Sequence, residues 1–288
     1  MVRLFSIFLY NLILLINFLF NFRKSNNLIY NLKNKLENKN YLKLKIENSF
    51  INFYAPNEIC RWRYNTIFTK EPETLDWINN FINKNNLIFW DIGANVGIYS
   101  IYSAVKHNNI KVVAFEPSTS NLRVLSRNIS INNFSNKIII NQTPLFDKDF
   151  GFQKLNEEGF NEGGALNAFS VDYGYDGKKF NPKNSYNIYG TSINFLLSNN
   201  ILEIPDYIKI DVDGIEDLIL KGGEKYLKHE KIKSILIELN ESFVDQTSNS
   251  INILKKNNFE LLYKKHSKEF DNSEKYSSIY NYVFKKKN

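Results

Sequence analysis

The sequence contains a single cysteine, Cys60, among its 288 residues. A disulfide within the chain is therefore excluded, and nothing in the cysteine content indicates an oxidising compartment. Histidine is also scarce, and the three present, His107, His229 and His266, lie far apart in the sequence. Zinc sites are built mainly from clustered cysteine and histidine ligands, so this composition argues against a zinc protein of that type. We expect a cytoplasmic protein.

The body of the chain lacks an excess of positive charge. Residues 1–46 carry eight basic side chains and one acidic side chain, which accounts for the whole net charge of +7. The other 242 residues carry 29 groups of each sign. Nucleic-acid binding usually requires a basic surface, so we expect no nucleic-acid partner.

One long apolar run stands at the N-terminus. Residues 4–22 are mostly apolar and lie between Arg3 and the pair Arg23 and Lys24. No small-residue cleavage site follows, so a cleaved signal peptide is not indicated. Three interpretations stay open: a helix docked on the protein or on a second subunit of a homodimer, an interfacial membrane helix assisted by the basic segment 23–45, or a transmembrane span. We treat residues 1–40 as a separate helical segment and assign any peripheral membrane contact to residues 1–24.

The rest of the chain alternates between predicted strands and helices. Residues 41–54 alternate in polarity and predict a hairpin, and a helix begins near Pro72, so residues 41–85 form an extension packed on the core. Short apolar strands are then predicted at 87–91, 111–116, 137–141, 207–211 and 233–239, with helices at 97–106, 118–132, 216–227 and 248–257. Such runs are typical of a parallel sheet buried on both faces. The C-terminal segments "FELLYKKH" and "SIYNYVFKK" predict an antiparallel pair at the sheet edge.

Acidic residues stand at or just after the ends of these strands. They are Asp91, Glu116, Asp211, Asp213 and Glu238. In an open parallel sheet, ligands bind beyond the carboxyl ends of the strands. We therefore expect these acids to meet at one site within a domain of residues 86–288.

The stretch "DIGANVG" predicts a loop that grips a nucleoside. Asp91, Gly93, Asn95 and Gly97 follow one another at intervals of two, and the two glycines let the backbone approach a ligand closely. Glu116 ends the next strand, where a carboxylate can accept both hydroxyl groups of a ribose. The glycine spacing of dinucleotide-binding proteins is absent, so a pyrophosphate is not indicated. S-adenosylmethionine, which carries a free ribose diol and no pyrophosphate, fits this pattern.

Several ordered blocks resemble the FkbM-type S-adenosylmethionine-dependent methyltransferases. They are "APNEICRWR", "TKEPETLDWI", "DIGANVGIYS", "AFEPS", "NISINN", "YIKIDVDGIEDLILKG" and "ILIELN". The resemblance implies an α/β fold, the Rossmann-like class I methyltransferase sheet of seven mostly parallel strands with the last antiparallel. It also implies methylation of hydroxyl groups on sugars, glycans or natural products. By the same resemblance, Asp91, Gly93, Asn95, Gly97 and Glu116 bind the cofactor, and Leu145 and Asp147 flank its adenine.

Methyl transfer to a hydroxyl group requires alignment and removal of a proton. "IDVDGIE" supplies Asp211, Asp213 and Glu216 within six residues, and Glu238 ends the following strand. We take these four acids as catalytic candidates, with Asp211 also beside the cofactor. Three readings stay open: a general base without metal, a Mg²⁺ site at Asp211 and Asp213, or acids that cap the following helix.

A long segment at 156–190 lies between the third and fourth predicted strands. It is rich in glycine, and we interpret it as a substrate lid lined by Phe169, Tyr173 and Tyr175. The alternative is a surface insertion.

Three other functions are conceivable for a sequence with this pattern. A nucleic-acid methyltransferase is disfavoured by the neutral body of the chain, and a nicotinamide dehydrogenase by the glycine spacing. A protein that binds S-adenosylmethionine without catalysis stays open, although the retained acids Asp211, Asp213 and Glu238 argue against it.

Overall fold

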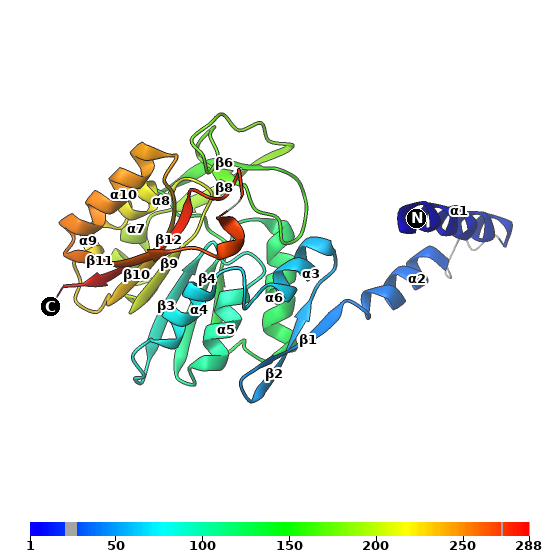
Figure 1. Cartoon of the computed structure of the whole chain (residues 1–288), viewed down its shortest axis with the longest axis horizontal. Helices are drawn as coiled ribbons and strands as arrows, with labels where there is room; N and C mark the ends of the chain where they lie inside the picture. Colours follow the sequence, from blue (N-terminus) through cyan, green and yellow to red (C-terminus); the bar gives the residue numbers. More distant parts are fainter. Residues whose placement is uncertain (21–27, 272, 288) are drawn as a thin grey trace.

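The computed structural model describes residues 1–20, 28–271 and 273–287. A seven-stranded sheet in the order β11-β12-β10-β9-β3-β4-β5 forms its centre (Figure 1). Its strands are β3 (Leu87–Ile92), β4 (Ile110–Phe115), β5 (Ile138–Asn141), β9 (Tyr207–Ile210), β10 (Ser234–Asn240), β11 (Phe259–Lys265) and β12 (Ile279–Lys286). Strands β5, β4, β3, β9 and β10 are parallel, and β12 runs antiparallel between β10 and β11. This order confirms the class I methyltransferase fold and the antiparallel C-terminal pair.

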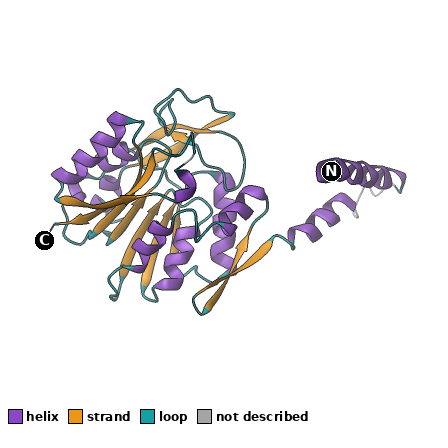
Figure 2. Cartoon of the chain, in the orientation of Figure 1, coloured by secondary structure: helices purple, strands orange, loops and turns teal. Residues whose placement is uncertain are grey.

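The central strands are buried because helices cover both faces of the sheet, as Figure 2 shows. All six residues of β3 are buried, as expected for an apolar run without polar alternation. The covering helices are α4 (Pro72–Asn79), α5 (Ile98–Lys106), α6 (Thr119–Ile131), α7 (Ile193–Ser198), α8 (Glu216–Lys221), α9 (Glu224–Leu227) and α10 (Val244–Lys256). The predicted helices at 97–106 and 118–132 are confirmed within one residue, whereas α10 begins four residues earlier than predicted.

The prediction of one helix over 216–227 is wrong. The structure divides this segment into α8 and α9 at Gly222 and Gly223. A Cβ atom at Gly222 would lie 2.1 Å from the backbone oxygen of Phe146, so the chain passes too close here for any larger residue. Glycine is also a weak helix former, and two in succession end the first helix.

The N-terminal extension of the core has the predicted hairpin. Strands β1 (Tyr41–Ile46) and β2 (Ser49–Tyr54) pair antiparallel, and α3 (Glu58–Asn65) follows. Ile46, Ile51 and Phe53 are buried in the same apolar cluster as Leu87 and Phe89 of β3. Burial of these side chains fastens residues 41–54 to the sheet domain.

The segment 156–190, predicted as a loop, contributes to a second sheet. Strands β6 (Phe150–Glu157), β7 (Ala168–Phe169) and β8 (Asn184–Thr191) form a three-stranded antiparallel sheet in the order β7-β6-β8. Burial alternates along β8, which is the period of a strand with one face on the protein. Glycine-rich stretches between these strands obscured that alternation in the sequence.

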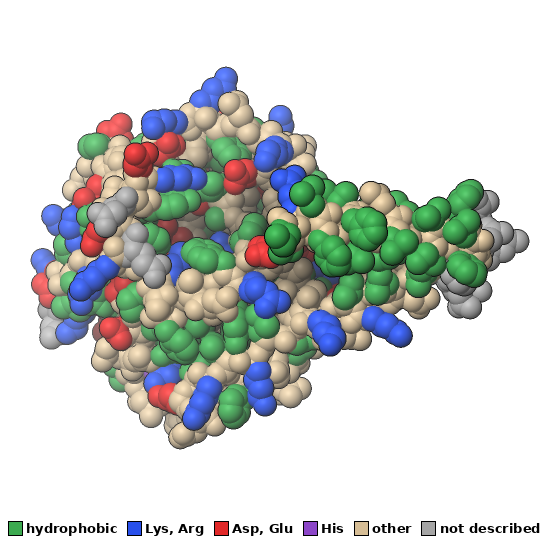
Figure 3. All heavy atoms as spheres, turned by 45° about the vertical axis from the view of Figure 1, so that its right-hand side comes forward, with side chains coloured by type: hydrophobic (Ala, Val, Ile, Leu, Met, Phe, Trp, Pro, Cys, Tyr) green, Lys and Arg blue, Asp and Glu red, His purple; other side chains and the backbone are tan. Residues whose placement is uncertain are grey.

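An N-terminal arm projects from this body. It consists of α1 (Val2–Leu19) and α2 (Leu28–Glu37), and α1 contacts α2 (Figure 1). No side chain of α1 is buried, so the structure does not dock this helix on the sheet domain. Figure 3 shows its apolar side chains as a continuous exposed surface. Arg23 and Lys24 lie outside the described residues.

Candidate active site

A cavity of about 480 Å³ lies at the carboxyl edge of the parallel strands. This volume is in the range of small-molecule sites. Its wall combines loops after β3, β4 and β9 with α3, the β6–β8 insertion and the C-terminal segment. The sheet reverses its order between β3 and β9, which is where ligands bind in folds of this kind.

The glycine loop forms the floor of the cavity beside β9. Gly93 has a φ of +84°, and a Cβ atom there would lie 1.8 Å from the backbone oxygen of Asp211. Only glycine can therefore hold this loop against the neighbouring strand end. Gly93 and Asn95 line the cavity, whereas Gly97 begins α5 behind them.

Glu116 lines the same end of the cavity and is only 4% exposed. Its Oε2 accepts a hydrogen bond from the backbone of Asn95 at 2.8 Å, and its Oε1 accepts one from the backbone of Ser118 at 2.8 Å. Burial raises the pKa of Glu116 to about 7, although these two hydrogen bonds oppose the rise. The carboxylate is thus held rigidly and is able to accept further hydrogen bonds.

Asp91 lies beneath the loop and does not line the cavity. Its side chain is fully buried, and Oδ2 accepts a hydrogen bond from the hydroxyl of Ser100 at 2.6 Å. Among the described residues, Oδ1 has no hydrogen-bond partner. Burial raises the pKa of Asp91, and the nearby Lys209 ammonium opposes that rise.

Asp211 lines the cavity and is paired from behind. Lys209, fully buried two residues earlier, donates to Oδ2 of Asp211 at 2.6 Å. Its ammonium also lies 5.0 Å from the ring centre of Tyr99. Desolvation lowers the pKa of Lys209, but Asp211, Asp91 and Glu71 outweigh it and raise the pKa above its usual value. Lys209 is therefore charged and holds Asp211 in place.

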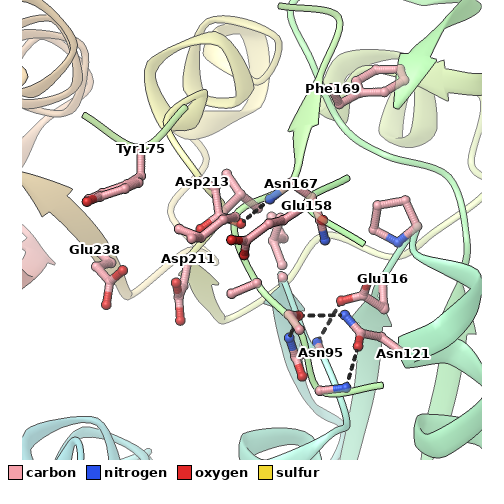
Figure 4. Close-up of a pocket in the computed structure, with 18 of the residues that line it drawn as sticks. Asn95, Glu116, Asn121, Glu158, Asn167, Phe169, Tyr175, Asp211, Asp213 and Glu238 are labelled. Carbon is pink, nitrogen blue, oxygen red and sulfur yellow. Dashed lines mark hydrogen bonds between the residues drawn. The ribbon is translucent and has the colours of Figure 1, made fainter. Parts of the chain in front are cut away.

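Asp213 also lines the cavity but bonds to the insertion. Its Oδ2 accepts a hydrogen bond from the backbone of Asn167 at 2.8 Å, as Figure 4 shows. Burial raises the pKa of Asp213 to about 6, and the hydrogen bond from Asn167 opposes the rise. This contact ties the strand end to the segment above it.

Glu238 differs from the other cavity acids. In the described part of the chain its carboxylate has no hydrogen-bond partner, although it lines the cavity. Burial and the charges of Asp211 and Glu71 raise its pKa well above the usual value. Figure 4 shows Glu238 and Tyr175 on one side of Asp211, with Glu116 and Asn95 on the other.

Three carboxylates cluster at this end: oxygen atoms of Glu71, Asp211 and Glu238 lie within 4.8 Å of one another. The cluster does not include Asp213, which the sequence had paired with Asp211 as a Mg²⁺ site. Two ammonium groups pair with two of its three acids instead: the buried Lys209 contacts Asp211, and the partly buried Lys70 contacts Glu71. Lys70 and Lys209 hold the pKa of Glu71 below its usual value, against its burial. Sequence reasoning missed both lysines and Glu71, although the alternation "KID" places Lys209 and Asp211 on one side of β9.

The remaining predicted site residues lie in different places. Leu145 lines the cavity and is 2% exposed, whereas Asp147 forms an exposed ion pair with Lys221 at 2.9 Å. Glu216 is not among the residues that line the cavity. It is 3% exposed, accepts from the backbone of Val212 at 3.3 Å and contacts the amide of Gln246. These contacts stabilise the start of α8, so Glu216 has a structural role there.

The insertion covers part of the cavity. Asn95 and Asn121 both donate side-chain hydrogen bonds to the backbone oxygen of Gly164, at 2.7 and 3.1 Å. Phe169 and Tyr175 line the cavity, as the lid interpretation predicted. Tyr173 instead packs against Phe243, with ring centres 5.5 Å apart.

Comparison with known proteins agrees with this geometry. The family model of the methyltransferase FkbM domain matches residues 91–261, more than half of the chain. Methyltransferase sdnD of Sordaria araneosa is 35% identical over 89 residues, which is 30% of this chain and 32% of that protein. The match therefore spans about a third of that relative.

Solved structures of related shape are more distant. A precorrin-6y C5,15-methyltransferase from Geobacter metallireducens has a TM-score of 0.44 at 15% identity, covering 75% of this chain and 87% of that one. The fibrillarin pre-rRNA processing protein of Methanococcus jannaschii has a TM-score of 0.46 at 13% identity, covering 85% and 82%. Likenesses at this level assign no activity. The family match covers most of the sheet domain and includes the residues of the glycine loop. This chain therefore belongs to the FkbM methyltransferase family and takes its methyl group from S-adenosylmethionine.

Proposed function

We propose that this methyltransferase methylates a hydroxyl group of a sugar, glycan or similar small-molecule acceptor, with Glu238 as the general base. The observation that carries the proposal is the state of Glu238, a cavity carboxylate with a raised pKa and no partner in the described part of the chain. A base works best when its pKa lies near the working pH. A weakly acidic hydroxyl group needs such a base as it attacks.

The residues at the other end of the cavity fit the cofactor. Glu116 would accept hydrogen bonds from the ribose, Gly93 and Asn95 would lie along the nucleoside, and Leu145 would contact the adenine. The buried Asp91, with one unpartnered oxygen among the described residues, supports the loop from beneath. When bound, S-adenosylmethionine supplies an electrophilic methyl group on a sulfonium. These residues orient that group toward the acceptor end.

Asp211 and Asp213 fit the role of base less well than Glu238. Asp211 already accepts a hydrogen bond from the charged Lys209, and Asp213 accepts one from the backbone of Asn167. One oxygen of each is thus already engaged, whereas the carboxylate of Glu238 has no hydrogen-bond partner in the described part of the chain. We assign both to positioning: Asp211 toward the acceptor, and Asp213 toward the insertion.

Aromatic side chains support a sugar-like acceptor. Trp62, Tyr175 and Tyr276 line the cavity, and the flat faces of aromatic rings pack against the apolar C–H faces of sugars. Their polar tips and the neighbouring Glu238 supply hydrogen-bonding groups for hydroxyls. An acceptor with several hydroxyl groups matches this mixture.

Glu238→Gln tests the assignment because it keeps the shape of the side chain and removes the proton acceptor. We expect kcat to fall by about 10²–10⁴-fold while the affinity for S-adenosylmethionine, measured by calorimetry, stays the same. The acidic limb of the pH–kcat profile should also disappear. A variant with nearly full kcat, or with the same acidic limb, would show that another group takes the proton.

We further propose that the chain is built from an arm of residues 1–40, an extension of residues 41–85 and a methyltransferase domain of residues 86–288, and that α1 attaches the protein to a membrane. The helix is long and apolar enough to cross a bilayer, and none of it is buried. Flotation of the full chain with anionic vesicles, weakened in a Phe8→Lys variant, is the expected result. Dimeric mass without vesicle binding would assign α1 to a second copy instead.

A further inference from the structure

The N-terminal arm is fastened to the body beside the cavity wall. Glu37, the last residue of α2, accepts hydrogen bonds from the hydroxyl of Tyr54 at 2.8 Å and from Arg123 at 3.3 Å. It also contacts Arg127, whose guanidinium lies 3.9 Å from the ring centre of Tyr54. These partners belong to β2 and α6, so the arm has a fixed root on the folded body.

The same root continues into the wall of the cavity. Arg123 donates to Glu162 at 2.7 Å, so one guanidinium joins the arm to the insertion. The side chain of Asn57 donates to the backbone oxygen of Glu162 at 2.9 Å. Gly163 and Gly164, which follow directly, line the cavity. The position of the arm is therefore linked to the part of the insertion that contacts Asn95 and Asn121, at the cofactor end of the cavity.

The mouth of the cavity is apolar on this side. We define the apolar rim as Ile59, Trp62, Phe160 and Tyr276, which are 38%, 45%, 61% and 37% exposed. Ile59, Trp62 and Tyr276 line the cavity, and Phe160 lies between the lining residues Gly159 and Asn161. Charges of both signs flank these side chains in the sequence: Arg61, Arg63 and Lys275, but also Glu58, Glu158 and Glu274. Exposed apolar and aromatic side chains gathered at a cavity mouth are typical of surfaces that meet lipid.

Figure 3 shows the exposed apolar arm beside a recess in the body. The 18 residues of α1 extend about 27 Å at 1.5 Å per residue, close to the roughly 30 Å hydrocarbon thickness of a bilayer. A membrane that holds α1 would lie on the side of the body where the arm is rooted.

We propose that the acceptor is anchored in a membrane, as a hydroxyl-bearing headgroup on a lipid, and enters the cavity across the apolar rim while the rim contacts the lipid surface. This rests on the proposed methylation of a hydroxyl group and names the class of molecule that carries it. A freely dissolved sugar can pack its C–H faces on Trp62 and Tyr276 but offers no apolar partner to Ile59 and Phe160. A lipid-borne headgroup brings acyl chains that such exposed apolar side chains can contact at the interface. Glu37, Arg123 and Glu162 connect the arm to the cavity wall and so fix the position of the arm relative to the cavity.

Trp62 reports on the proposal directly. The chain has three tryptophans, and Trp77 and Trp90 are 5% and 0% exposed, whereas Trp62 is 45% exposed. Vesicles of phosphatidylglycerol and brominated phosphatidylcholine should quench part of the emission of the full chain, and the Trp62→Phe protein should lose that quenching. Vesicle binding without quenching of Trp62, or no vesicle binding, would overturn the proposal.

The product gives an independent readout. Full-length protein, labelled S-adenosylmethionine and cell membranes should yield label that extracts into organic solvent as a methyl ether. Phe160→Gln should lower this yield several-fold, whereas Phe152→Gln, at a phenylalanine on β6 that is 73% exposed against 61% for Phe160, should not. A methyl ether on a water-soluble product, unaffected by Phe160→Gln, would refute the lipid-borne acceptor alone. Label on nitrogen or in an ester would instead refute the proposed hydroxyl chemistry.

Discussion

Replacing Lys209 by methionine is expected to lower the free energy of unfolding by about 3–5 kcal/mol at neutral pH, the cost of breaking a buried ion pair from one side. Lys209 is fully buried and donates to Asp211 at 2.6 Å. Its charge also faces Asp91 and Glu71. Methionine fills a similar volume, so the loss would arise from uncompensated carboxylates rather than from a cavity.

The loss should depend on pH in a defined direction. In the native protein the pKa of Glu71 is held below its usual value, so this group stabilises the fold above the pKa of the unfolded chain and loses that effect as pH falls. Without Lys209 the carboxylates near it take up protons more readily in the folded state. The difference in stability between the two proteins should therefore shrink as pH falls from 7 toward 5.

Guanidinium chloride unfolding at several pH values measures both effects. Lys111→Met is the matched control. Lys111 pairs with Glu203 at 3.1 Å, and the two side chains are 52% and 60% exposed. Loss of such an exposed ion pair should lower the free energy of unfolding by less than about 1 kcal/mol. In the double variant Lys209→Met/Asp211→Asn, the two changes should couple by about 0.5–3 kcal/mol. A loss below about 1 kcal/mol for Lys209→Met, or one that does not change with pH, would refute the electrostatic reasoning.

Other outcomes follow from the cofactor end and the carboxylate cluster. Gly93→Ala should abolish binding of S-adenosylmethionine in calorimetry, because the added Cβ would meet the backbone oxygen of Asp211 at 1.8 Å; near-native affinity would contradict this. The affinity for S-adenosylmethionine should rise with pH through about 7, because Glu116 then ionises and can only accept hydrogen bonds from the ribose hydroxyls. The Glu116→Gln variant should bind S-adenosylmethionine more weakly and without this pH dependence. EDTA should leave activity unchanged, since Lys70 and Lys209 already pair with two of the three acids of the cluster; activity lost to EDTA and restored by Mg²⁺ would show that a metal is used.

The order of elements could be predicted because it depends on local pattern. Buried parallel strands appear as short apolar runs, and the acids at their ends must gather at one edge of the sheet. Asp211, Asp213, Glu116 and Glu238 do line one cavity. The paired glycines that split α8 from α9 escaped prediction, because the close approach of Phe146 comes from a segment about 75 residues away.

The roles of the individual acids could not be separated in the same way. Asp211, Asp213 and Glu216 look alike in "IDVDGIE", yet one bonds to a buried lysine, one to the insertion, and one turns into the protein. Each outcome depends on which distant segment packs beside the side chain.

By itself, the sequence determined the class of sheet, the glycine loop and the separation of a charged, apolar N-terminus from a neutral body, because these properties reside in the spacing of neighbouring residues. Only the tertiary structure decided that Lys70 and Glu71 join Asp211, that Glu238 is left without a partner in the described chain, and that α1 stays exposed. The physical reason is that a side chain's protonation and hydrogen bonding follow from burial and from charges within a few ångströms, and segments remote in sequence supply most of these.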